Sequence, residues 1–296
     1  MAKTEINTKG AFYIRESHLR RIEKLRLMDD DFFSEALDGK REAVQYILRV
    51  ILNRDDLEVV ATKAQVEYRS ATKRSIRIDI KAVDQTGRHF DIEIQCENKG
   101  TGAKRARFHG SMIDWELLEK NQDFEELPES FVIFITENDK YACDVPVYHI
   151  ERRIEEDNYS LFEDGLHILY VNGEYQDAAT PVGRLMHDFH CTKSEDMYSR
   201  ELADEVKYLK ETEGGQAHMC KILEEMCDEV AERVEKETAE RVEKETAERV
   251  EKENKIKMAK RLLKLNKLSY EEISETAGLS LSKVKELAAE KWHNTQ

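Results

Sequence analysis

Residues 76–95 read IRIDIKAVDQTGRHFDIEIQ, a segment in which apolar and polar side chains alternate. A period of two is typical of a β-strand, and the β-branched isoleucines favour one. The DQTG segment at residues 84–87 interrupts this alternation with turn-forming residues. We therefore predict a β-hairpin with one apolar and one polar face, whose register pairs Ala82 with Phe90, Ile80 with Ile92, and Asp79 with Glu93.

The segments around this hairpin predict a mixed α/β domain. Residues 12–55 carry apolar positions at helical spacing, and a second helical stretch covers residues 103–120. The continuous apolar run at residues 131–136 is typical of a central strand that is buried on both faces. Another strand is expected at residues 166–171, and helix returns from Val182. We expect one domain over residues 1–198, with a mixed sheet flanked by helices.

Residues 199–254 are dominated by charged side chains and end in three octads, AERVEKET, AERVEKET and AERVEKEN, at residues 231–254. Within the octads, glutamates stand four positions before lysines or arginines, which is the order that stabilises a helix. Eight residues at 100° each shift the Ala/Val stripe by about 80° per octad, whereas a coiled coil keeps its seam in place. We predict a solvated, charged helical spacer rather than a coiled coil.

Residues 255–296 carry three short helical signals. Residues 255–266 are basic and amphipathic, Ser269 to Glu272 form a capping box, and Gly278 ends that second helix. Ser280 or Ser282 begins the third. The pattern is similar to a helix-turn-helix pair that contacts DNA, and the competing interpretation is a small helical cap or protein-contact module.

The net charge depends strongly on the segment. The 296 residues contain 47 lysines and arginines and 62 aspartates and glutamates, a net charge of −15 that argues against a general nucleic-acid binder. Residues 63–107, however, hold 11 basic and 6 acidic side chains, and residues 255–268 hold 6 basic side chains and no acid. Residues 108–190 hold 5 basic and 19 acidic side chains. Phosphate binding follows local potential, so the two basic segments keep a nucleic-acid partner open.

Nothing in the sequence predicts a membrane span or export. There is no apolar run of about eighteen residues, and the first residues lack the apolar core of a signal peptide. Five scattered cysteines predict reduced thiols and a cytoplasmic protein. His187, His190 and Cys191 could suggest zinc, but without a second ligand cluster we favour a structural role. Tyr68 and Trp115 are expected in the core.

Asp79 and Glu93 are the strongest candidates for chemistry. Two like charges directly opposite on a sheet are destabilising, and the pairing makes sense if a cation bridges them. Two carboxylates and a backbone carbonyl, for which Ile94 is the natural donor, suit Mg²⁺, with Mn²⁺ as a substitute. Gln95 lies on the same face and can hold a water or a phosphate oxygen. The competing interpretation is an ordinary hairpin whose polar face is solvated.

A basic helix start follows the hairpin. Lys104, Arg105 and Arg107, with His109 nearby, could meet phosphate groups together with the amide dipoles of the helix. A solvated helix face is the competing interpretation for each of these side chains.

The hairpin residues resemble a known sequence motif. Arg77-Ile78-Asp79 followed by Asp91-Ile92-Glu93-Ile94-Gln95 resembles the D…E-x-Q variant of the PD-(D/E)XK nuclease motif, and more narrowly the recombination-promoting nuclease and transposase family of bacteria. The segment LMDDDFF at residues 27–33 is similar to that family's D-x-x-F segment if Asp30 is its aspartate, although Ser34 stands where the family has lysine. The resemblance spans roughly residues 12–210.

The resemblance implies a restriction-endonuclease-like core, αβββαβ in outline, and a metal-dependent endonuclease that hydrolyses DNA in recombination or mobile-element movement. Asp79 and Glu93 would be metal ligands, Gln95 would take the place of the usual lysine, and Asp30, with Asp31 as a rival, would be the acidic residue of the first helix. The alternative is a weak or inactive scaffold of the same fold that binds DNA or protein. A third interpretation, a homo-oligomerising helical protein, fits residues 200–296 and leaves the hairpin unexplained.

Overall fold

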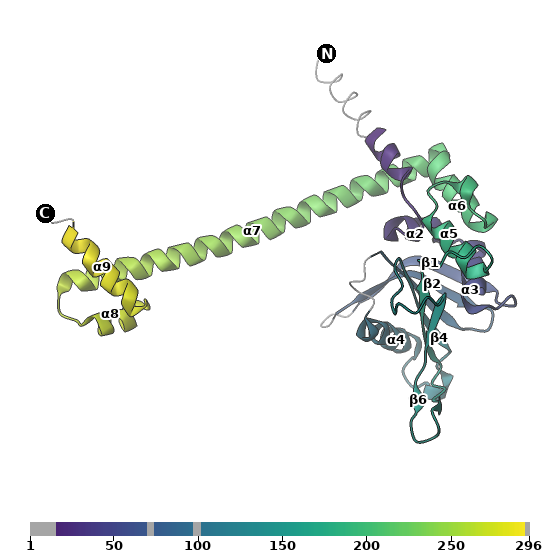
Figure 1. Ribbon diagram of the computed structural model, residues 1–296, viewed down its shortest axis with the longest axis horizontal. Helices are drawn as coiled ribbons and strands as arrows, with labels where there is room; N and C mark the ends of the chain where they lie inside the picture. The colour runs from purple at the N-terminus through teal and green to yellow at the C-terminus, as the bar shows by residue number, and fades with distance from the viewer. Residues whose placement is uncertain (1–15, 70–73, 97–101, 294–296) are drawn as a thin grey trace, which may run out of the picture. The chain divides into compact units, whose positions relative to one another are not determined.

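The computed structural model describes residues 16–69, 74–96 and 102–293 (Figure 1). The chain divides into two compact units between Ile222 and Leu223. Among the described helices, none combines the length and the apolar character that crossing a bilayer requires.

The first unit is built on a six-stranded mixed sheet with the strand order β1-β2-β3-β4-β8-β5. Strands β1 to β3 are antiparallel neighbours, β3-β4 and β4-β8 are parallel, and β5 runs antiparallel to β8. Two short strands, β6 and β7, form a separate hairpin. The strands are β1 (Val59–Tyr68), β2 (Ile76–Asp84), β3 (His89–Gln95), β4 (Ser130–Thr136), β5 (Val147–Ile150), β6 (Arg153–Ile154), β7 (Ser160–Leu161) and β8 (Leu166–Asn172).

Helices flank this sheet, with α4 on one side and α2, α3 and α5 on the other (Figure 1). The region expected to be helical over residues 12–55 is interrupted. Residues 16–22 are helical, and Gly39, with φ of +69°, separates α2 from α3. The mixed sheet flanked by helices confirms the predicted fold class. The helices are α2 (Asp30–Leu37), α3 (Arg41–Leu52), α4 (Ala103–Leu117), α5 (Pro181–His190) and α6 (Arg200–Glu211), with 3-10 turns at Phe124–Glu126 and Ser194–Asp196.

The hairpin of β2 and β3 has the predicted register as far as Ile80 and Ile92, but the ladder does not include the third predicted pair, Asp79 with Glu93. Ile80 pairs with Ile92 and Ala82 with Phe90, and Gly87 adopts φ of +85° in the turn. The polar face is not solvated, however, because α4 lies against it and Asp79 and Glu93 are 5% and 0% exposed. The interpretation of an ordinary hairpin with a solvated polar face is therefore wrong.

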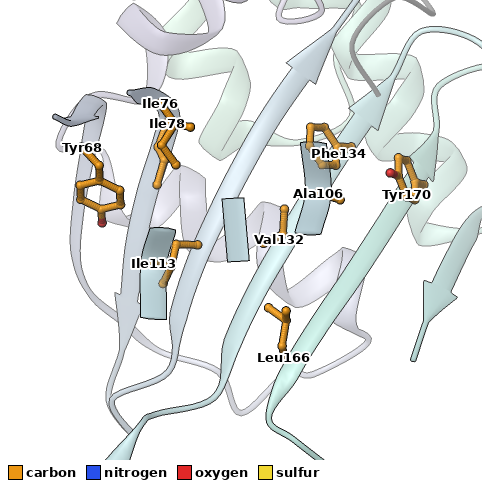
Figure 2. Close-up of a cluster of buried hydrophobic side chains, with 9 residues drawn as sticks. All are labelled: Tyr68, Ile76, Ile78, Ala106, Ile113, Val132, Phe134, Leu166 and Tyr170. Atoms are coloured by element: carbon orange, nitrogen blue, oxygen red, sulfur yellow. The ribbon is translucent and has the colours of Figure 1, made fainter. Parts of the chain in front are cut away.

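Figure 2 shows the apolar cluster that fixes α4 on the sheet. Ala106 and Ile113 of α4 pack with buried side chains from β1, β2, β4 and β8. Tyr68 belongs to this cluster, as expected, whereas Trp115 is 64% exposed. The strand members are Tyr68, Ile76, Ile78, Val132, Phe134, Leu166 and Tyr170.

Helix α7 (Glu213–Leu265) begins in the first unit and continues through the octads into the second unit. Residues 230–254 are exposed throughout. Helices α8 (Tyr270–Ala277) and α9 (Leu281–His293) complete the second unit. The predicted capping box at Ser269 and Glu272 forms, and Gly278 ends α8 with φ of +62°. The long helix and the small helical end therefore agree with the sequence.

Candidate metal and phosphate site

A cavity of about 750 Å³ lies where β2 and β3 meet α2 and α4. Acidic and basic side chains share its wall, since Asp30 and Asp79 face the same space as Arg77, Lys104 and Arg105. Gln95 completes this part of the lining. The cavity therefore brings together groups that could bind a metal ion with groups that could bind phosphate.

Beyond the last paired residues of β2 and β3, the side-chain carboxylates of Asp79 and Glu93 accept hydrogen bonds from the backbone amides of the opposite strand. The paired residues of the ladder end at Ile80 and Ile92. Beyond that point, the Ile94 amide donates to Asp79 Oδ2 over 3.0 Å, and the Asp79 amide donates to Glu93 Oε1 over 3.2 Å. Each side chain is thus fixed by the backbone of the opposite strand, which gives the two carboxylates a defined position before any ligand arrives.

Burial makes these carboxylates costly to ionise. Desolvation, followed by repulsion from Glu93 and Asp30, raises the pKa of Asp79 to about 8. Desolvation, followed by repulsion from Asp91, raises the pKa of Glu93 to about 8. Desolvation also raises the pKa of Asp30, whose Oδ1 is buried without a hydrogen-bond partner among the described residues. Such a cluster would gain most from a cation that compensates its charge.

A chain of hydrogen bonds extends from Glu93 into the protein. Arg105 Nη2 donates to Glu93 Oε2 over 2.7 Å, and Arg105 Nε donates to His109 Nε2 over 3.3 Å. Since Nε2 accepts, Nδ1 of His109 carries the proton that it shares with Asp91 Oδ2 over 2.8 Å. Desolvation lowers the pKa of His109, which favours this neutral form. The chain fixes the orientation of Arg105 over Glu93.

Most of the predicted site residues come together. Asp30, Asp79, Gln95, Lys104 and Arg105 all line the cavity. Glu93 lies directly behind them, because the Arg105 guanidinium covers it.

The remaining predictions fall outside the cavity wall. Ile94 contacts Asp79 through its amide, whereas its carbonyl as a metal ligand stays a prediction. Arg107 is exposed and is not part of the cavity wall, and Asp31, the rival of Asp30, does not line it either.

Four further residues join the site in roles that the sequence analysis did not assign: Arg77 and Asp91 were only neighbours of the motif residues, and His109 was expected at phosphate. Arg74 and Arg77 line the cavity, and both belong to the basic segment at residues 63–107, which was the signal available in the sequence. Asp91 and His109 form the buried pair behind Arg105. Their partnership could not be read from spacing, because it depends on which face of α4 meets the sheet.

The donor set fits a hard divalent cation. Asp30, Asp79 and Glu93 offer carboxylate oxygens, the ligands that Mg²⁺ prefers, and the unpartnered Asp30 oxygen is a free acceptor beside them. Two groups of described residues bring ligand atoms close together: Asp91, Glu93 and His109 behind the cavity, and His187, Asp188 and Cys191. Both carboxylate oxygens of Asp188 already accept backbone amides, those of Tyr198 and Ser199, so a structural role is favoured there.

Comparison with known proteins identifies a family. Residues 31–262 match the model of a family described as PD-(D/E)XK nuclease family transposase, and Asp30 stands one residue before the matched range. No curated protein and no solved structure matches the chain. The match indicates a nuclease related to transposition or recombination.

Proposed function

Since the chain belongs to the PD-(D/E)XK nuclease family transposases, we propose that it is an endonuclease that hydrolyses DNA phosphodiester bonds with Mg²⁺ or Mn²⁺. The proposal rests chiefly on the interlocked carboxylates of Asp79 and Glu93 at a cavity that also carries basic side chains. Buried like charges destabilise a folded protein, and a bound metal ion would compensate them.

Asp79 and Glu93 would hold the metal, with Asp30 supplying a third carboxylate from α2. Asp30 is the better candidate from this helix because it lines the cavity and has a free buried oxygen, whereas Asp31 does not line it. A bound divalent ion would polarise a water molecule and neutralise negative charge on the phosphate. The carboxylates would have to release their protons for this, and the bound charge would lower their pKa.

The basic side chains would orient the DNA backbone. Arg74, Arg77 and Lys104 line the cavity and are exposed, so phosphate oxygens can reach them. Arg105 is half-buried and already paired with Glu93, so its role would be to fix that carboxylate as well as to face the phosphate. Arg107 is the weaker candidate, because it lies outside the cavity wall.

Gln95 would position a water or a phosphate oxygen by hydrogen bonds. It lines the cavity at the end of β3, where its backbone carbonyl accepts the Glu137 amide over 3.0 Å. A neutral amide is a poor base, so a proton of the attacking water would have to pass to the phosphate or to solvent. Hydrolysis by this site is therefore expected to be slower than with a lysine at this position.

Two observations favour the alternative of an inactive scaffold that keeps the fold and binds DNA or protein. Gln95 brings no positive charge, and the Arg105 guanidinium sits 2.7 Å from Glu93, where a cation would compete with it. The two functions differ in a single measurable property, which is cutting.

Plasmid nicking tests the proposal. The purified chain with Mg²⁺ or Mn²⁺ should convert supercoiled DNA to nicked or linear DNA, and EDTA should stop it. Asp79→Ala and Glu93→Ala should each lower the rate on the order of a thousandfold, because metal-assisted charge stabilisation supplies several kcal/mol. Glu240→Ala, an exposed acid in the octads, is the matched control and should cut normally.

Two results would contradict this proposal in different ways. Normal cutting by both alanine variants would place the active site elsewhere. A wild-type chain that cuts no form of DNA with either metal, while remaining folded, would favour the scaffold.

A further inference from the structure

The second unit contains a pair of helices whose connecting turn has the length found in helix-turn-helix DNA-binding motifs. Three residues, Gly278, Leu279 and Ser280, join α8 to α9, and the left-handed Gly278 makes the sharp turn. Helix-turn-helix motifs have a turn of three to four residues that often contains glycine. The pair packs on the end of α7 through Ala259, Ile273, Ala277, Val284 and Leu287. The unit therefore has a core of its own.

The end of α7 presents a basic stripe on the side away from this core. Lys257, Lys260, Arg261 and Lys264 follow the spacing i, i+3, i+4, i+7, which puts them on one helix face. All four are exposed, whereas Ile256, Ala259 and Leu263 pack against α8 and α9. The stripe therefore concentrates positive charge on one accessible face of the helix.

The octads on the same helix have a different charge pattern from the basic stripe. Their cations, such as Lys236, Lys244 and Lys252, each follow a glutamate by four positions, so positive and negative charge alternate. From Asn254 to Tyr270 there is no acidic residue at all. Within the stripe only Lys257 follows a glutamate, Glu253, by four positions, and such a cationic face attracts a polyanion.

We propose that residues 255–293 are a second DNA-binding site, in which the basic stripe of α7 contacts phosphates of duplex DNA and the first turns of α9 face the bases. In this motif the second helix enters the major groove with its N-terminal residues toward the base edges. The exposed side chains there are Ser282, Lys285 and Glu286, which can donate or accept hydrogen bonds. This site uses no residue of the cutting site and does not depend on metal.

Binding of the full-length chain to a labelled duplex of about 30 base pairs, in EDTA so that no DNA is cut, tests the proposal. The fourfold variant Lys257→Gln, Lys260→Gln, Arg261→Gln, Lys264→Gln removes the stripe. The matched control removes three lysines and one arginine from the octads of the same helix: Lys236→Gln, Lys244→Gln, Arg249→Gln, Lys252→Gln. Both variants carry the same change in net charge.

The stripe variant should bind at least tenfold more weakly at about 100 mM salt. The magnitude of the slope of log K against log salt should drop by about 3.6 if all four side chains contact phosphate, since each lost contact removes about 0.9. The octad control should stay within about twofold, which the lost net charge alone permits. Equal weakening of both variants, or of neither, would overturn the proposal.

Two further measurements distinguish a lost DNA contact from a lost fold, and duplex DNA from duplex RNA. If the fourfold variant melts early, the single variant Lys285→Glu should still weaken DNA binding severalfold with unchanged melting, and unaltered binding by a folded Lys285→Glu chain would overturn the assignment of α9. Stronger binding to duplex RNA than to duplex DNA would also overturn it. Because cutting is not measured, failure here leaves the nuclease proposal untouched, and loss of nicking by Asp79→Ala leaves this one untouched.

Discussion

Acidic side chains occupy two contrasting settings in this chain. In the hairpin of β2 and β3, Asp79, Asp91 and Glu93 are at most 5% exposed, and burial raises the pKa of each to about 8. In the octads of α7, the glutamates are exposed, and most of them stand four positions before a cation. Both regions are rich in carboxylates, but only in the hairpin are the carboxylates buried away from water.

The number of charged residues in a region does not indicate a functional site, whereas the burial of those residues does. Exposed ion pairs along a helix contribute a few tenths of a kcal/mol each and can be exchanged freely. Buried carboxylates lower the stability of the folded chain when they are ionised without a compensating partner, and this cost supports the proposal of a bound cation beside Asp79 and Glu93. The predictions below separate these two classes of charge.

The largest expected effect is the pH dependence of stability in EDTA. The pKa of Asp79 and Glu93 is about 8 in the folded chain and about 4 when unfolded, so the folded state binds more protons between these values. The free energy of unfolding should therefore fall as pH rises from 4 to 8. Asp79→Asn should flatten this dependence and stabilise the metal-free chain at pH 8 by on the order of a few kcal/mol.

Chemical denaturation at several pH values in EDTA measures this effect. The matched control is Glu240→Gln, which should keep the wild-type pH dependence because this glutamate is exposed. If Asp79→Asn loses stability with pH as steeply as the wild type does, the buried carboxylate is not the source of the dependence.

Lys210 extends the comparison to a buried cation. Its Nζ donates to the carbonyl oxygens of Glu23, Leu25 and Thr192, over 3.2, 2.5 and 2.5 Å, and desolvation lowers its pKa to about 8. Lys210→Met should lower the free energy of unfolding by about 2–3 kcal/mol, because three carbonyls lose their donor. Lys207→Met, on the exposed side of the same helix, should change it by less than about 0.5 kcal/mol. Equal denaturation midpoints for the two variants would remove this contrast.

His109 tests whether the buried chain behind Glu93 positions the metal site. His109→Phe removes both hydrogen bonds, those with Arg105 and Asp91, and should weaken Mn²⁺ binding in calorimetry by roughly 10- to 100-fold. His109→Asn keeps a donor toward Asp91 and should recover part of the affinity. His149→Phe replaces an exposed histidine and should bind as the wild type does. Unchanged affinity in a folded His109→Phe chain would limit His109 to packing.

The smallest effect is expected from the octads. Deletion of residues 239–246 removes one complete AERVEKET unit and leaves the flanking pairs in register. Plasmid nicking should stay within about twofold and the free energy of unfolding within about 0.5 kcal/mol, the range typical of surface changes. A large loss of nicking would show that the octads do more than separate the segments on either side of them.

The sequence predicted the parts of the fold that depend on local pattern. Period two and the DQTG turn were enough for the register of Ile80 with Ile92, and the apolar run at residues 131–136 was enough for the central strand β4. The short strands between Val147 and Leu161 were missed, because strands of two to four residues carry too few positions to show a period.

The grouping of the candidate site residues was predicted where these residues share one motif, and it was missed where packing decides. Asp79, Glu93 and Gln95 lie on adjoining strands, so their meeting follows from the hairpin. The pair of Asp91 with His109, and the exposure of Trp115, depend on how α4 is rotated on the sheet. Helical spacing alone does not fix that rotation, which the cluster around Ala106 and Ile113 sets.

The reciprocal bonds between β2 and β3 give the site two built-in spectroscopic probes. The amides of Asp79 and Ile94 donate to the two carboxylates that would hold a metal. A change in charge or orientation of either carboxylate must therefore alter the environment of a backbone proton that NMR can observe directly. Titration of an ¹⁵N-labelled chain with Mg²⁺, which is diamagnetic, would follow occupation of the site through these two resonances without DNA and without turnover.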